Sequence, residues 1–191
     1  MSHPAPRPVS GPGPARIRAA GLALAALTCA VDQAVKAWML GPLALPQVGQ
    51  ITLAPIFNLT FAGNPGVSLS LLAASSDNGR WALVALTAAI ALGVLVWLWR
   101  ERRVADALPL GLILGGALGN IVDRIRFGFV VDYADLHFGD FRPFLVFNLA
   151  DAAITLGVVI ILARSFLSRE KRAMPAAGLS DADPATTAPE S

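Results

Sequence analysis

The stretch Trp81–Trp99 reads WALVALTAAIALGVLVWLW and contains no charged side chain. An α-helix rises about 1.5 Å per residue, so this stretch is long enough to cross a hydrocarbon core of about 30 Å. An uninterrupted apolar run of this length is typical of a transmembrane helix. The rest of the fold must therefore be built around a membrane span.

Three more segments are apolar enough to cross a bilayer, at about 19–40, 107–122 and 146–163. The chain of 191 residues is 55% hydrophobic and only 15% charged, and its mean hydropathy is +0.61. The third segment repeats glycine at every fourth position, which lets a neighbouring helix backbone come close; these glycines are Gly111, Gly115 and Gly119. We predict an all-α polytopic membrane protein with four transmembrane helices.

Lysine and arginine flank these segments unevenly. The loops at about 41–80 and 123–145 hold few of them, whereas most lie before the first span, between the second and third, and after the fourth. The positive-inside rule therefore places both termini and the 100–106 loop in the cytoplasm, and the other two loops outside. The residues on the predicted cytoplasmic side are Arg7, Arg16, Arg18, Arg100, Arg102, Arg103, Arg164, Arg169, Lys171 and Arg172.

The segments outside the spans differ in composition. Residues 1–15 are rich in proline and glycine and residues 173–191 in alanine, proline, serine and aspartate, so we predict two disordered cytoplasmic tails around a membrane domain at 16–165. In the long outer loop, 51–53 and 57–61 are short β-like runs before the turn-forming 63–66. We expect a small extracytoplasmic β-like platform there, followed by an amphipathic stretch.

The composition argues against a nucleic-acid partner and against an internal disulfide. The basic residues flank apolar segments instead of forming a patch with interleaved aromatics, so we expect no nucleic-acid partner. The single cysteine, Cys29, excludes an internal disulfide.

The polar groups of the spans all fall toward one end of the predicted bundle. An ionised carboxylate at the centre of a membrane helix costs about 2.5–3.5 kcal/mol, so Asp32, Asp123 and Asp151 must be paired or hydrated. Asp32 and Lys36 lie at i and i+4 in the favourable order for an ion pair. We expect Arg124 to clamp Asp123 or neighbouring carbonyl groups with its fork of donors.

Asp132 in GFVVDY (128–133) and Asp151 in FNLAD (147–151) suggest a specific chemistry. Two carboxylates that share one proton can divide acid and base catalysis between them, as in aspartic proteases. Either aspartate can hold that proton. The simpler alternatives are a loop carboxylate at Asp132 and a carboxylate stabilised by the helix dipole at Asp151.

Three other readings stay open on the residues alone. A metal site could use Asp132, Asp135, His137 and Asp140 as ligands. Its weakness is that only one histidine lies near these acids. A Ser–Lys dyad would need a neutral Lys36, which Asp32 opposes; its serine would be Ser68, Ser70, Ser75 or Ser76. A transporter would need ionisable groups through the whole membrane depth, whereas the inner halves of the spans have none.

Five motifs follow one another along the chain, namely Asp32-Gln33-x-x-Lys36, Asn64-x-Gly66, GGALGNxxDR at 115–124, Val130-Val131-Asp132 and Phe147-Asn148-x-Ala150-Asp151. In these motifs, and over about residues 17–164, the chain resembles the bacterial lipoprotein signal peptidases, also called signal peptidase II. One position departs from the pattern, because Leu69 stands where the family usually has phenylalanine.

The resemblance implies a function and a site. It implies that Asp132 and Asp151 form a catalytic dyad, and that further matched residues bind substrate or support the dyad; these are Asp32, Lys36, Asn64, Gly66, Gly116, Asn120, Asp123, Arg124, Asn148 and Ala150. Such enzymes remove signal peptides from diacylglyceryl-modified prolipoproteins, cleaving before the lipidated cysteine at the outer face of the cytoplasmic (inner) membrane. No metal or cofactor is expected. The expected partners are these substrates and membrane lipids, and we expect a monomer.

Overall fold

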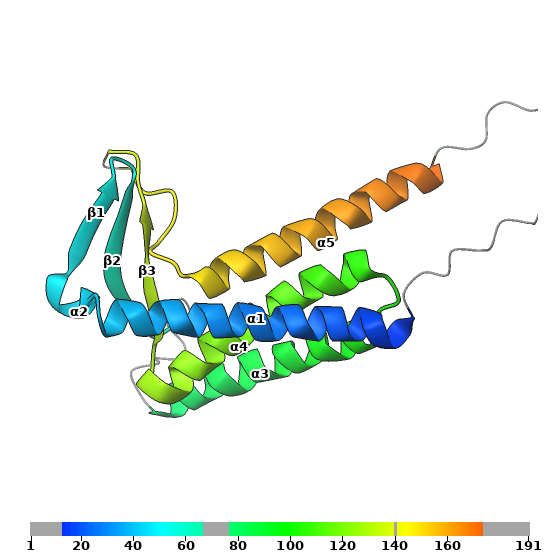
Figure 1. Ribbon diagram of the computed structural model, residues 1–191, viewed down its shortest axis with the longest axis horizontal. Helices are drawn as coiled ribbons and strands as arrows, with labels where there is room; N and C mark the ends of the chain where they lie inside the picture. The colour runs from blue at the N-terminus through cyan, green and yellow to red at the C-terminus, as the bar shows by residue number, and fades with distance from the viewer. Residues whose placement is uncertain (1–12, 67–76, 140, 174–191) are drawn as a thin grey trace, which may run out of the picture.

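A computed structural model describes residues 13–66, 77–139 and 141–173 of the chain (Figure 1). Several sequence-based predictions concern residues outside these ranges and are not addressed by the structure. They are the disorder of residues 1–12 and 174–191, the amphipathic stretch over 67–76, and the roles of Leu69 and Asp140.

Four long helices are apolar enough to cross a membrane, and they are α1 (Pro14–Leu40), α3 (Asp77–Arg100), α4 (Val104–Phe127) and α5 (Leu149–Ala173). This confirms the predicted fold class. Helix α1 already begins at Pro14, a residue that favours the first helical position, so the predicted disordered segment reached slightly too far. Helix α5 begins three residues later than predicted, because Asn148 lies before the helix and not in its first turn.

Helix α4 is the centre of the bundle. It packs against α1, α3 and α5, and it is the most buried of the four spans. Its glycines explain this position: Gly111 packs on the backbone of Gly21 in α1, and Gly116 packs on Ala150 in α5. A Cβ atom at Gly116 would lie 2.5 Å from the Ala150 carbonyl oxygen. The predicted small-residue contact face is therefore present, and it serves two neighbours of α4.

A small antiparallel sheet lies at one end of the bundle, opposite the end where the two termini leave (Figure 1). Its strand order is β1 (Gln50–Ala54), β2 (Phe57–Asn64) and β3 (Val130–Leu136), and the one-turn helix α2 (Leu45–Val48) precedes it. An apolar cluster joins the sheet to the end of α1; its buried members are Met39, Leu45, Leu59, Tyr133 and Ala134.

The first two strands match the predicted β-like runs, whereas β3 was expected to be part of a loop. Residues Val130–Asp135 are all buried, so this strand lacks the alternation of apolar and polar residues that reveals a half-exposed strand. Its register pairs Ala62 with Asp132 and Asn64 with Val130. Asp132 is thus held by backbone pairing in a sheet, and its position is far more defined than that of a loop residue.

The close approach of α4 and α5 gives a direct test. Gly116→Ala should destabilise the protein by about 1–3 kcal/mol, because the new methyl group meets backbone atoms that cannot move aside. Thermal unfolding in detergent, followed by tryptophan fluorescence, measures this change. Gly93→Ala in α3 is the matched control, since nothing lies within 4 Å of its Cβ position. Equal stability of the two variants would show that α5 does not pack on Gly116.

Candidate active site

The first turn of α5 is held by a reciprocal pair of hydrogen bonds. The backbone N–H of Asp151 donates to Asn148 Oδ1 at 2.9 Å, and the backbone N–H of Asn148 donates to Asp151 Oδ2 at 3.3 Å. This is the capping-box arrangement, with asparagine as the N-cap and aspartate three residues later. The sequence Asn-Leu-Ala-Asp therefore starts the helix and at the same time fixes the direction of the Asp151 carboxylate.

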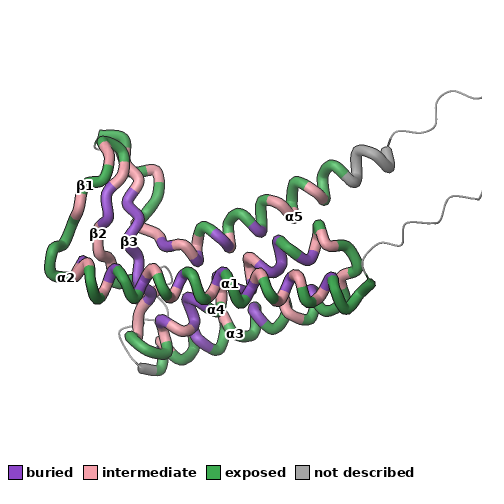
Figure 2. Tube along the Cα trace, in the orientation of Figure 1, coloured by how far each residue is buried: buried purple, intermediate pink, exposed green. Residues whose placement is uncertain are grey.

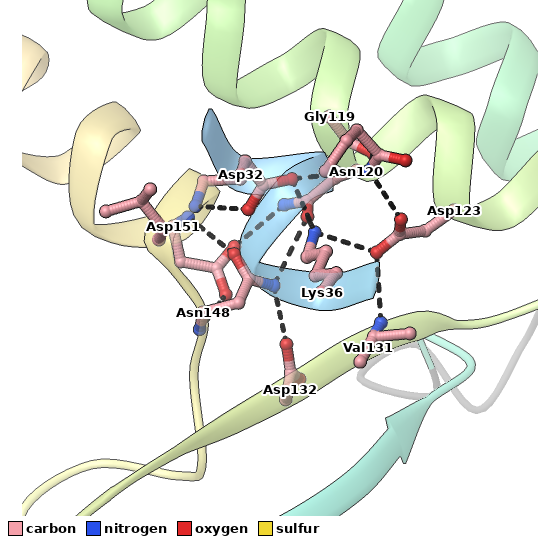
Figure 3. A network of polar contacts seen from close by, with 12 residues as sticks. Asp32, Lys36, Gly119, Asn120, Asp123, Val131, Asp132, Asn148 and Asp151 are labelled. Carbon is pink, nitrogen blue, oxygen red and sulfur yellow. Dashed lines mark hydrogen bonds and ion pairs between the residues drawn. The ribbon is translucent and has the colours of Figure 1, made fainter. Parts of the chain in front are cut away.

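Two asparagine amides connect Asp132 to Asp151 (Figure 3). Asn148 Nδ2 donates to Asp132 Oδ1 at 2.6 Å and to Asn120 Oδ1 at 3.2 Å. Asn120 Nδ2 in turn donates to Asp151 Oδ1 at 2.8 Å. The two carboxylates, which lie 19 positions apart in the sequence, are thereby joined through β3, α4 and α5 in one hydrogen-bonded chain.

Beneath this chain lies Lys36, which is buried together with its partners. Its Nζ atom lies 2.9 Å from Asp32 Oδ2, 2.7 Å from Asp123 Oδ2 and 3.1 Å from Asn120 Oδ1. An ammonium group has three donors, and each of them has an acceptor here. The predicted Asp32–Lys36 pair is thus present, and Asp123 is its third member.

The acidic members of this cluster also bind backbone amides beside the dyad. Asp32 Oδ1 accepts a hydrogen bond from the N–H of Ala150 at 3.0 Å, and Asp123 Oδ2 accepts one from the N–H of Val131 at 3.1 Å. Ala150 directly precedes Asp151 and Val131 directly precedes Asp132. We refer to Asp32, Lys36 and Asp123 as the ion cluster. It holds the backbone next to each candidate catalytic aspartate.

Asn64 and Gly66 extend from the end of β2 toward the dyad. Asn64 Oδ1 accepts a hydrogen bond from the N–H of Gly66 at 2.9 Å, and the Asn64 side chain also hydrogen-bonds Asp132. Gly66 adopts a positive φ of 86°, which a residue with a side chain would adopt only with strain. A Cβ atom at this position would lie 3.7 Å from Arg124 Nη2.

Arg124 does not make the clamp that the sequence suggested. Asp123 turns to Lys36, and it accepts a further hydrogen bond from Gln33 Nε2 at 2.7 Å. Within the described ranges Arg124 makes no ion pair, and its buried Nε atom has no hydrogen-bond partner. Its guanidinium group nevertheless lies within electrostatic reach of Asp132 and Asp151. It is a half-buried cation beside the two carboxylates, and its Nε atom has no partner among the described residues.

Burial raises the pKa of Asp132 to about 6, and the nearby charge of Asp151 acts in the same direction. The hydrogen bonds from Asn64 and Asn148 oppose this rise but do not cancel it. Asp132 is therefore the member of the pair that holds a proton to a higher pH than an ordinary aspartate does. Two adjoining carboxyl groups with one proton between them are suited to acid and base catalysis of hydrolysis.

The comparison with known proteins agrees with this geometry. The sequence profile of a family described as signal peptidase (SPase) II matches residues 24–167, about three quarters of the chain. The chain belongs to the signal peptidase II family. Proteins of this family are proteases, so the transporter reading of the buried acids is removed.

Two relatives show how extensive the similarity is. The lipoprotein signal peptidase of Sphingopyxis alaskensis is 53% identical over 164 residues, which cover 86% of this chain and 92% of that protein. That of Rhizorhabdus wittichii is 50% identical over 155 residues, covering 81% and 90%. A solved bacterial membrane enzyme shares the fold, with a TM-score of 0.69 at 21% identity over 84% of this chain and 95% of its own.

The other readings of the site find less support in the structure. Asp135 lies on β3 but turns away from the dyad, accepting a hydrogen bond from Thr60 at 3.2 Å and pairing with Arg142 at 3.4 Å. No group of three or more His, Cys, Asp or Glu side chains comes together within the described parts of the chain. Lys36 is paired with two carboxylates and an asparagine, so its three donors are already in use within the ion cluster. The four candidate serines lie outside the described ranges.

Two contributors to the site carried no predicted role. Gln33 Nε2 donates to Asp123 and also to the carbonyl oxygen of Gly119 at 3.1 Å. Gly119 itself is required because a Cβ atom there would collide with the Asp32 carboxylate. Both residues stand in the family motifs quoted from the sequence, Gln33 beside Asp32 and Gly119 beside Asn120, but neither was given a role of its own.

The raised pKa of Asp132 predicts a pH-dependent stability. The folded protein binds a proton at Asp132 more tightly than the unfolded chain does, so this residue loses its stabilising contribution as the pH rises from about 4 through 6. Asp132→Asn is uncharged at every pH and escapes that loss. The difference in Tm between Asp132→Asn and wild type should therefore shift in favour of the variant between pH 4 and pH 7. A difference that stays constant would contradict the raised pKa.

The ion cluster gives a second prediction. Lys36→Met leaves Asp32 and Asp123 buried without their cation, which should cost about 3–5 kcal/mol of stability and lower the folded yield. Size-exclusion profiles and thermal unfolding in detergent report both quantities. Arg126→Met is the control, because Arg126 is an exposed cation near Asp123 at the C-terminal end of α4. Its loss should change stability by no more than about 0.5 kcal/mol.

Proposed function

We propose that this protein is an aspartic endopeptidase that removes signal peptides from diacylglyceryl-modified prolipoproteins, cleaving before the lipidated cysteine. The observation that carries the proposal is the pair Asp132 and Asp151, joined through two asparagine amides, with the pKa of Asp132 raised to about 6. The names of its relatives point to the same substrates.

The surroundings of the two acids suggest how the shared proton is divided. Asp151 accepts hydrogen bonds from Asn120 and from the N–H of Asn148, and it stands in the first turn of α5, where the helix dipole favours an ionised carboxylate. Asp132 is buried in β3 and ionises reluctantly. In the resting pair we assign the proton to Asp132, which leaves Asp151 to act as the base.

The reaction then follows in two proton-balanced steps. Asp151 takes a proton from a water molecule whose oxygen attacks the scissile carbonyl carbon, while Asp132 donates its proton to the carbonyl oxygen. When the tetrahedral intermediate collapses, the C–N bond breaks and the leaving amine takes the proton from Asp151. One hydroxyl of the intermediate returns a proton to Asp132 as the new carboxyl group forms. The step requires no metal ion.

The remaining family-matched residues have two kinds of role in this proposal. Arg124 and Asn64 face the dyad with donors that can bind backbone carbonyl groups of the substrate on either side of the scissile bond. Asp32, Lys36, Asp123, Asn120 and Asn148 are positioning residues, since they hold the dyad and its backbone. Gly116 and Ala150 permit the close approach of α4 and α5, and Gly66 permits the turn beside Arg124.

We further propose that both termini are cytoplasmic and that the dyad lies near the outer face of the bacterial cytoplasmic membrane. The arginine asymmetry supports this orientation, because ten of the 15 lysine and arginine residues belong to the start of α1 and the segment before it, the end of α3 and the loop after it, and the C-terminal half of α5. A substrate anchored by its own lipid reaches such a site by diffusing in the bilayer. We propose that the enzyme acts as a monomer, because both candidate catalytic residues belong to one chain.

The dyad is tested by substitutions that keep shape and remove the titratable proton. Asp132→Asn and Asp151→Asn should each reduce cleavage of a lipidated precursor by about 10³-fold or more, and the double variant should be hardly worse, since members of one catalytic unit are strongly non-additive. A gel-shift assay with purified protein measures the cleavage. Asp135→Asn on the same strand is the control and should retain most activity. A single variant that cleaved near the wild-type rate would refute the aspartic mechanism.

Orientation is tested by labelling in intact cells. In a Cys29→Ser background, Gln50→Cys should react with a membrane-impermeant maleimide, because Gln50 is an exposed polar residue at the start of β1 in the sheet. Arg102→Cys, at the opposite end, should react only after the cells are permeabilised. The reverse pattern would place the dyad on the cytoplasmic side.

A further inference from the structure

A groove opens from the dyad onto the membrane-facing side of α5. Its volume is about 450 Å³, and Asp151 lies at one of its ends. Thr155 and Val159 continue along the same helix face at steps of four residues, and Phe144 and Phe147 form the opposite wall. Apart from Asp151 and Thr155, the lining side chains are apolar.

The groove faces lipid and not protein. Helix α5 contacts mainly α4, and much of its remaining surface is exposed along its length (Figure 2). Val159 is 54% exposed, and Leu156 in the same groove is 53% exposed. The loop that forms the opposite wall is equally apolar at its surface, with Phe144 61% exposed. The groove is thus continuous with the lipid-facing surface of the spans.

The wall at the dyad end is firmly held. Phe147 exchanges backbone hydrogen bonds with Ala134 of β3, at 2.7 Å and 3.0 Å. It lies next to Asn148, whose amide binds Asp132. The end of the groove at Phe147 therefore has a defined position relative to Asp132 and Asp151.

The dimensions of the groove favour a narrow occupant. From Asp151 to Val159 the helix rises about 12 Å, so the groove is elongated along α5. A helix with side chains is about 10–12 Å across, nearly as wide as the groove is long. Polymethylene chains are far thinner. A depth of about 12 Å also corresponds to most of one leaflet of a bilayer whose core is about 30 Å thick.

We propose that this groove binds an acyl chain of the diacylglyceryl group carried by the substrate cysteine. The inference rests on the proposed function and adds the place where the lipid is recognised. The chain would enter beside Asp151 and run along Thr155 toward Val159. Because the cysteine adjoins the scissile bond, a chain seated here brings that bond to the dyad. Lipid recognition and positioning of the peptide for cleavage are then the same event.

The experiment compares precursor peptides of one sequence that carry dioctanoyl, dilauroyl or dipalmitoyl glyceryl groups. For the wild type, kcat/KM should rise with chain length until the chain fills the groove. Val159→Trp blocks the far end, so it should lower kcat/KM for the dipalmitoyl precursor about tenfold or more, through the lost burial of several methylene groups, and leave the dioctanoyl precursor within about twofold. Val159→Ala should shift the preference toward longer chains.

Val158→Trp is the matched control, because Val158 is also lipid-exposed, at 40%, but does not line the groove. It should leave the dependence on chain length unchanged. If Val159→Trp lowers the rate equally for all three precursors, or leaves all three unaffected, the acyl chain does not lie in this groove and the inference is wrong. The same assay tests the cleavage of lipidated precursors separately from the groove. That part of the proposed function is wrong if the wild type cleaves none of the three precursors.

Discussion

The pairing of Lys36 with Asp32 and Asp123 is the constraint on which the site depends. A buried ammonium group without its partners would cost several kcal/mol, so the folded state must bring the three side chains into contact. Asp32 and Lys36 belong to α1 and Asp123 to α4, so their meeting fixes the register of these two helices. A buried ion cluster of this kind adds little net stability, because its desolvation offsets much of the attraction. Its contribution is to select one register of α1 against α4, because apolar contacts alone would allow the two helices to pack in several registers.

The same cluster defines where the two candidate catalytic aspartates lie. Each of its carboxylates also accepts a hydrogen bond from a backbone amide, that of Ala150 at Asp32 and that of Val131 at Asp123. The α-helix and the β-strand that carry the dyad are thus fastened to one charged centre. Gly116 and Gly119 make this possible, because side chains at these positions would hold α5 and Asp32 away from α4.

Local sequence patterns predicted the features that depend on residues close together in the chain. Apolar length gave the four spans, the i and i+4 spacing gave the Asp32–Lys36 pair, and β-branched and aromatic runs gave β1 and β2. The third member of the ion cluster could not be found in this way, because Asp123 lies far from Lys36 in sequence and its neighbour Arg124 was the obvious cation. Strand β3 was missed for a related reason, since its burial on both faces removes the usual alternation. Carboxylate chemistry suggested that Asp132 and Asp151 pair, but the link itself depends on tertiary contacts of Asn120 and Asn148, which no local pattern predicts.

The double use of Asn148 has a consequence for the biosynthesis of the protein. One end of its side chain starts α5, and the other end binds Asp132, so the last helix and the paired acids are completed together. Because α5 follows every other element in the chain, a nascent or partly inserted molecule holds Asp132 without its partner. In the mechanism proposed above, hydrolysis therefore requires the closed bundle, so the order of the elements along the chain makes the acid pair the last part of the site to be assembled.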